Sequence, residues 1–168
     1  MNVACSSGVV PFGQFLGNDS DHNFSKLGGD FLRAAKILNK EYQNAPEWTT
    51  CFMAFQALEL YLKSYLLRKG RNLRYVEKQI GHKLTLAVKE AKTMGLILPV
   101  IPELEQAVME FSEIYSRKDL QYRSIGEWKI VPPDLLLSFV DEVVRAVSGN
   151  PRGLNLVPGD REIETDAI

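Results

Sequence analysis

The feature that most constrains the fold is the long apolar segment from Trp48 to Lys69, WTTCFMAFQALELYLKSYLLRK. Large apolar residues fall on nearly every side of a helix built from it, and one narrow polar stripe interrupts them. The stripe consists of Gln56, Glu59 and Lys63, and the last two have the order and spacing of an i,i+4 ion pair. A helix that is apolar almost all round belongs in the middle of a bundle. The segment therefore predicts a central helix with other helices packed around it.

Four further segments have the apolar spacing of amphipathic helices. Strand signals are weak throughout, and most connections are short. The sequence therefore predicts an all-α fold, an up-and-down antiparallel bundle of about five helices. The first segment begins between Ser25 and Asp30 and ends at about Tyr42, and the others run from about His82 to Met94, from near Pro102 to Tyr115, and from Pro133 or Asp134 to about Val147.

The chain of 168 residues has the length of one domain. We predict an irregular N-terminal segment at 1–22 and the helical bundle at 23–149. Residues 150–168 carry prolines, glycines and acidic residues, which are typical of a flexible tail or a docking arm.

Charge and cysteine content narrow the compartment and the partners. The net charge is -1, from 20 basic and 21 acidic residues, so binding to nucleic acid would need a local patch. Gln56, Glu59 and Lys63 interrupt the longest apolar run, and we expect no membrane span. Cys5 and Cys51 are far apart, which argues against a disulfide framework. These features favour a cytoplasmic protein.

Few residues carry the chemistry of a metal or cofactor site. His22 and His82 are the only histidines, and no Cys or His cluster has ligand spacing, so we expect no metal and no cofactor. Cys51 lies within the apolar segment and is expected to be a small buried hydrophobe rather than a nucleophile. His82 follows Gly81 at the opening of a helix, where we expect it to cap or to pack.

The stretch 115–124, YSRKDLQYRS, crowds arginines and tyrosines at the end of a predicted helix. From the residues alone it is an active site, a binding surface or a solvated helix end. In the last case Arg117 and Arg123 would pair with Glu59 or other acids, while Tyr115 and Tyr122 would pack with their polar tips at the surface.

Three stretches together resemble the HEPN family (higher eukaryotes and prokaryotes nucleotide-binding). They are AFQALELYLKSYLLRKG, IGHKLTLAVKEAKTMGL and YSRKDLQYRS, and the resemblance spans about residues 30–148. It implies a small helical bundle that often dimerises, so that the ends of the fourth helices meet across a cleft. Many members are metal-independent ribonucleases, frequently toxins or antiviral factors, and others are non-catalytic.

The resemblance also locates the site, and the chain departs from the family there. The family's nucleases have an arginine followed after four to six residues by a histidine. Arg117 matches the arginine, but Tyr122, Arg123 and Ser124 occupy the positions of the histidine. Tyrosine has a pKa near 10 and is a poor general base at neutral pH. The usual nuclease mechanism is therefore not expected.

Three functions follow as expectations. The first is a dimeric HEPN-like module that binds nucleotide, RNA or a partner protein through Arg117, Tyr122 and Arg123, with Glu59 and Lys63 facing the cleft. Its setting would be a toxin–antitoxin or antiviral defence system, with an antitoxin or a nucleotidyltransferase as partner. The second is a divergent metal-independent endoribonuclease that uses Arg117, Tyr122 and Arg123. The third is a structural interaction subunit that binds no ligand and docks through its tail.

Overall fold

The computed structural model describes residues 20–41, 47–98, 106, 108–110, 112–113 and 132–149. These residues form helices and short connections without any strand, which confirms the all-α prediction. Residues 106, 108–110 and 112–113 are also helical. The elements are α1 (Ser20–Glu41), α2 (Glu47–Arg68), α3 (Leu73–Tyr75), the π-helical turn η2 (Val76–Ile80), α4 (Leu84–Thr93) and α6 (Pro133–Ser148).

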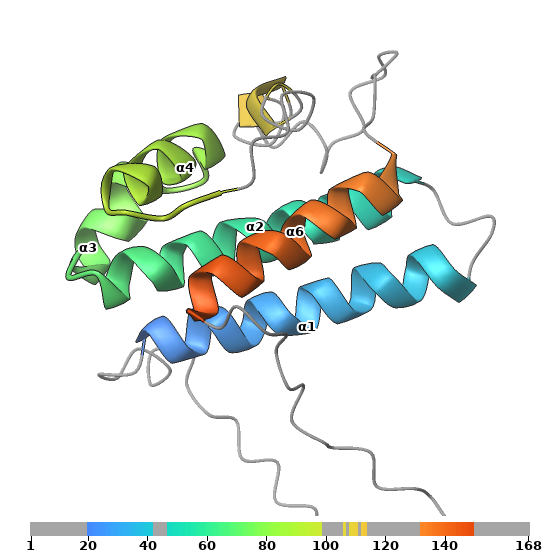
Figure 1. Ribbon diagram of the computed structural model, residues 1–168, viewed down its shortest axis with the longest axis horizontal. Helices are drawn as coiled ribbons and strands as arrows, with labels where there is room; N and C mark the ends of the chain where they lie inside the picture. Colours follow the sequence, from blue (N-terminus) through green and yellow to red (C-terminus); the bar gives the residue numbers. More distant parts are fainter. Residues whose placement is uncertain are drawn as a thin grey trace, which may run out of the picture.

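Helix α2 is the centre of the molecule, as its composition predicted. Every residue from Ala57 to Leu66 is buried, so the helix is enclosed on all sides over almost three turns. Helices α1 and α6 pack against it, and α4 covers it on the side away from α1 (Figure 1). Burial of this many large apolar side chains is the main force that holds the helices together.

The helices that flank α2 differ in direction. Lys36 of α1 contacts Asp141 of α6 at 2.7 Å, and Asn39, further along α1, reaches Asp134 at the start of α6, so these two helices are antiparallel. Arg68, at the end of α2, donates a hydrogen bond to the carbonyl oxygen of Val147 near the end of α6. Helices α2 and α6 therefore run in the same direction, and α1 runs against both (Figure 1).

Helix α1 begins at Ser20, earlier than the predicted start between Ser25 and Asp30, and Gly28 and Gly29 lie inside it. A Cβ atom added at Gly28 would lie 3.2 Å from Cδ2 of Tyr61, closer than almost all such contacts. The glycine therefore lets α1 approach α2 closely at this point, which offsets its low helix propensity. The bundle correspondingly starts before the predicted boundary at residue 23.

The chain turns back along α2 after Gly70, which adopts a positive φ of 95°. Helix α3 and the turn η2 form this return, and α4 then reverses direction again beyond Gly81. At the far end of α4, the hydroxyl of Tyr65 donates to the carbonyl oxygen of Met94 at 3.0 Å. Helix α4 lies within the predicted range 82–94.

Helix α6 confirms the predicted segment, with Pro133 in its first turn and Gly149 in a left-handed conformation after it. Several predicted features lie outside the described residues: Tyr42, the helix start near Pro102, the stretch 115–124, and residues 150–168. In the part of the chain that is described, no helix combines the length and apolar composition needed to cross a membrane.

Candidate functional site

The polar stripe of the central helix is a buried ion pair. Nζ of Lys63 lies 2.5 Å from Oε1 of Glu59, which confirms the predicted i,i+4 pair. Glu59 is only 2% exposed and Lys63 7%, so the pair lies within the bundle rather than on its surface. The Lys63 ammonium also lies 5.9 Å from the centre of the Phe24 ring of α1, within cation–π range. Both charges have been removed from water, which is costly unless each has a partner.

His82 completes the pair from a different element. Its Nδ1 lies 3.3 Å from Oε2 of Glu59, so the two carboxylate oxygens face a lysine and a histidine respectively. The imidazole side chain is 56% exposed, whereas that of Glu59 is 3% exposed. His82 thus connects a buried carboxylate to the protein surface. We call Glu59, Lys63 and His82 the α2 polar cluster.

His82 contacts Glu59, a partner that the expectation of a capping or packing role did not name. The N-cap residue of α4 is Lys83, whose side chain makes no capping hydrogen bond. Gly81, with a φ of 55°, lets the chain leave η2 and brings His82 back over α2. Glu59 and His82 are 23 positions apart in the sequence, and no local pattern predicts their contact because only the return of the chain brings them together.

Ser112 connects the same region to the helical stretch that precedes the YSRKDLQYRS motif. Its hydroxyl accepts a hydrogen bond from the backbone N–H of Thr85 at 3.2 Å, and Ser112 is itself buried. This bond satisfies one of the free N–H groups in the first turn of α4. No sequence signal marked Ser112, since a lone serine in an amphipathic pattern carries no information about its partner.

The remaining predicted site residues, Arg117, Tyr122 and Arg123, lie outside the described residues. The structure therefore brings together two of the five predicted residues, Glu59 and Lys63, and adds His82 to them. Ser112 contacts Thr85, three residues after His82. The alternative in which Arg117 or Arg123 pairs with Glu59 stays a prediction.

Cys51 is a buried hydrophobe, as predicted, with 1% of its surface exposed. Burial raises the pKa of its thiol to about 11, and the nearby carboxylate of Glu47 adds to the shift. The thiolate that a nucleophile requires is therefore disfavoured at neutral pH. Among the described residues, no group of three or more His, Cys, Asp or Glu side chains is placed to hold a metal ion.

Comparisons of this chain with protein-family models, with curated proteins and with solved structures found no match. The contacts of the α2 polar cluster and the sequence of the 115–124 stretch thus carry the functional argument.

Proposed function

We propose that this chain is a HEPN-like helical module that forms a homodimer and binds single-stranded RNA or nucleotides through their phosphates. The observation that carries the proposal is the α2 polar cluster. A buried carboxylate with a lysine on one oxygen and a half-exposed histidine on the other is an unusual arrangement for the middle of an apolar helix. Its position on α2 is the one that the resemblance implies for cleft-facing polar residues.

The position of Ser112 supports the same proposal. Ser112 contacts Thr85, which follows His82 by three residues in the sequence. Covalent geometry keeps the Cα atom of Tyr115 within roughly 11 Å of that of Ser112, because Tyr115 is three positions further along the chain. The arginine-rich stretch begins three positions after Ser112 in the sequence. Arginine is well suited to phosphate, since its planar fork can donate two parallel hydrogen bonds.

The test of phosphate binding is a fluorescence titration of labelled single-stranded RNA at two salt concentrations, with nucleoside triphosphates as competitors. We expect binding that weakens steeply as salt rises. The slope of this salt dependence should fall by about 0.7 in Arg117→Ala and in Arg123→Ala, because each variant removes a cation that neutralises one phosphate. Arg74→Ala is the matched control, because Arg74 is an exposed arginine of α3. An RNA affinity that is immeasurable at low salt, or equal losses in all three variants, would remove the proposal.

Dimer formation is a separate part of the proposal and has its own measurement. The resemblance implies that two cluster regions face each other across a dimer cleft, which would double the phosphate-binding residues. Analytical ultracentrifugation of the full chain should give twice the chain mass of 19.0 kDa. A monomer at all concentrations would contradict this part and leave the binding test unaffected.

A second candidate function, metal-independent cleavage of RNA, is favoured by the contact between His82 and Glu59. A carboxylate that accepts a hydrogen bond from Nδ1–H stabilises the tautomer whose basic lone pair is on Nε2. Such a ring could take the proton from a ribose 2′-hydroxyl while the 2′-oxygen attacks phosphorus. The P–O5′ bond would break as that proton returns, from the imidazolium or through a water molecule, to the leaving 5′-oxygen, which leaves a 2′,3′-cyclic phosphate and a 5′-hydroxyl. This assigns the acid–base role to His82 rather than to Tyr122.

Cleavage is tested by incubating the full chain with labelled RNA and a chelator. The candidate predicts product that forms without metal and that is abolished by His82→Ala and by Arg117→Ala, while His22→Ala, on α1, keeps wild-type activity. Intact RNA after long incubation, under conditions where the RNA is bound, would exclude cleavage and leave the binding module as the function.

A further inference from the structure

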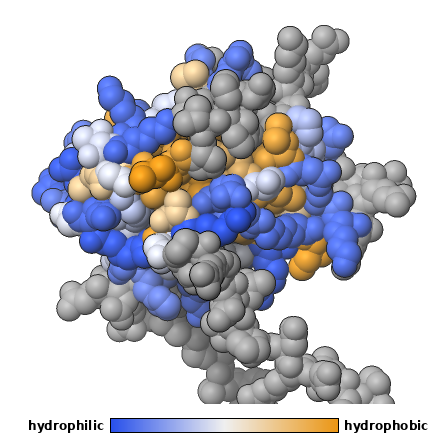
Figure 2. All heavy atoms as spheres, in the orientation of Figure 1, coloured by the Kyte–Doolittle hydropathy of each residue, from blue (hydrophilic) through white to orange (hydrophobic). Residues whose placement is uncertain are grey.

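An open groove of about 860 Å³ lies at the opposite end of α2 from its N-terminus, separate from the α2 polar cluster. It runs between the end of α2, the connection that follows α4, and the last two turns of α6. On the face shown in Figure 2, apolar surface is flanked by hydrophilic side chains in the region between α4 and α6. We call this groove the α2–α6 groove. The lining residues used in the argument below are Lys69, Ile97, Arg68, Glu142, Arg145 and Gly149.

The groove combines an apolar element with a cationic rim. Ile97 is 86% exposed, the most exposed of the large apolar residues in the described part of the chain, and Leu96 and Leu98 beside it are buried. The lining of the groove contains one acidic side chain, Glu142, and three basic ones, Arg68, Lys69 and Arg145. A ligand with apolar residues and an excess of carboxylates would complement both features.

The sides of the groove are held in place by named contacts. Arg68 donates to the carbonyl oxygen of Val147 at 2.6 Å, which ties the ends of α2 and α6 together. Tyr65 contacts Met94 at 3.0 Å and thereby fixes the start of the connection that carries Ile97. Lys69 lies over the Tyr65 ring at 5.4 Å. A groove with such fixed walls requires little reorganisation to bind a peptide.

The sequence beyond α6 has this complementary chemistry. Its last part, 160–166, reads DREIETD, in which every second residue is acidic. Alternate side chains of an extended chain point to the same side, so Asp160, Glu162, Glu164 and Asp166 would form one acidic face. Upstream, Leu154 and Leu156 likewise share a side in an extended chain.

The same segment is attached at the groove itself. Gly149 lines the groove and has a φ of 65°, which ends α6 in a left-handed conformation. The next four residues, NPRG, have the asparagine, proline and glycine positions typical of a type I turn. The five residues from Gly149 to Leu154 span up to roughly 17 Å, which sets how far from Gly149 the leucines can lie.

We propose that residues 154–166 bind in the α2–α6 groove of their own chain, with the leucines against Ile97 and the acidic face toward Lys69 and Arg145. The groove is thus a site for an extended, acidic and apolar peptide. The tethered segment occupies it at a high effective concentration, so modest contacts suffice. A partner with a similar peptide would have to displace the segment to bind.

The test is limited trypsin digestion of the full chain, with mass spectrometry to follow cleavage after Arg161, which lies within the acidic segment. In the bound state this bond is protected. Lys69→Glu/Ile97→Glu removes one rim cation and the exposed apolar residue, and we expect cleavage after Arg161 to be at least about fivefold faster than in the wild type. The matched control is Lys78→Glu/Leu27→Glu, which likewise replaces one lysine and one large apolar residue by glutamate, at exposed positions on η2 and α1, and should leave the rate unchanged.

A second comparison needs no variant. Raising the salt from about 50 mM to about 500 mM should accelerate cleavage in the wild-type chain more than in a free peptide of residues 150–168, because salt screens the rim charges. Equal rates in the wild type, both variants and the free peptide would overturn the proposal. Protection that increases with protein concentration would also overturn it, since the occupant would then come from a second copy.

Discussion

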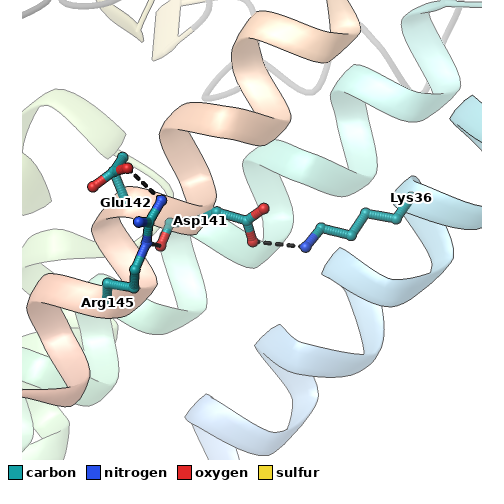
Figure 3. A network of polar contacts seen from close by, with 4 residues as sticks. All are labelled: Lys36, Asp141, Glu142 and Arg145. Atoms are coloured by element: carbon teal, nitrogen blue, oxygen red, sulfur yellow. Dashed lines mark hydrogen bonds and ion pairs between the residues drawn. The ribbon is translucent and has the colours of Figure 1, made fainter. Parts of the chain in front are cut away.

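Two of the ion-pair networks in the described part of the chain differ sharply in their environment. The pair Lys36–Asp141 joins α1 to α6 at the surface, where 47% and 36% of the two side chains are exposed, and Arg145 and Glu142 lie beside it on α6 (Figure 3). The pair Glu59–Lys63 lies on the central helix with 3% and 9% of the side chains exposed. The same kinds of charged group thus occupy opposite dielectric environments.

The difference indicates what each network does. A surface pair keeps most of its hydration, so it costs little and contributes little to stability. A buried pair loses the hydration of both ions, and apolar residues of the same volume would often be as stable or more so. A contribution to stability therefore does not explain why the α2 polar cluster is present. Its contact with half-exposed His82 is consistent with the proposed role in phosphate binding.

The largest predicted effect comes from removing one member of the buried pair. Lys63→Ala leaves the carboxylate of Glu59 buried without its ammonium partner, and we expect a loss of about 3–5 kcal/mol in the free energy of unfolding. Urea denaturation followed by circular dichroism measures it. The companion variant Glu59→Leu/Lys63→Met replaces both charges, and it should be as stable as the wild type or more stable. A double variant as unstable as Lys63→Ala would contradict the comparison.

A second buried ionisable group, Cys51, extends the comparison to pH. Its pKa is raised to about 11 in the folded protein, from an ordinary value of 9.0. Between these values the unfolded chain releases the thiol proton and the folded chain retains it, so alkaline pH favours unfolding. The wild type should lose roughly 2 kcal/mol of stability relative to Cys51→Ala between about pH 9 and pH 11. A stability difference that stays constant over this range would show that the thiol titrates normally.

The smallest effect is expected at the surface network. Lys36→Ala and Asp141→Ala, combined in a double-mutant cycle, should give a coupling energy of about 0.2–1 kcal/mol that decreases in high salt. Denaturation midpoints of the four proteins provide the measurement. A coupling of several kcal/mol that is insensitive to salt would mean that the surface and buried pairs do not differ as described.

The sequence predicted those features that depend on one helix, and it failed for those that depend on two. The central position of α2 and the Glu59–Lys63 pair follow from composition and spacing within one segment. The first helix was predicted to begin between Ser25 and Asp30, whereas α1 begins at Ser20 and Gly28 lies inside it against Tyr61 of a different helix. The contact of His82 with Glu59 depends on the return through η2 and Gly81, which no local pattern records.

The most direct test of the account compares RNA affinity with stability in the double variant Glu59→Leu/Lys63→Met. If the α2 polar cluster serves binding, this variant should fold as stably as the wild type and yet bind labelled single-stranded RNA more than about tenfold more weakly, a loss of roughly 1.4 kcal/mol. An equally stable variant that binds RNA with the wild-type affinity would contradict the account.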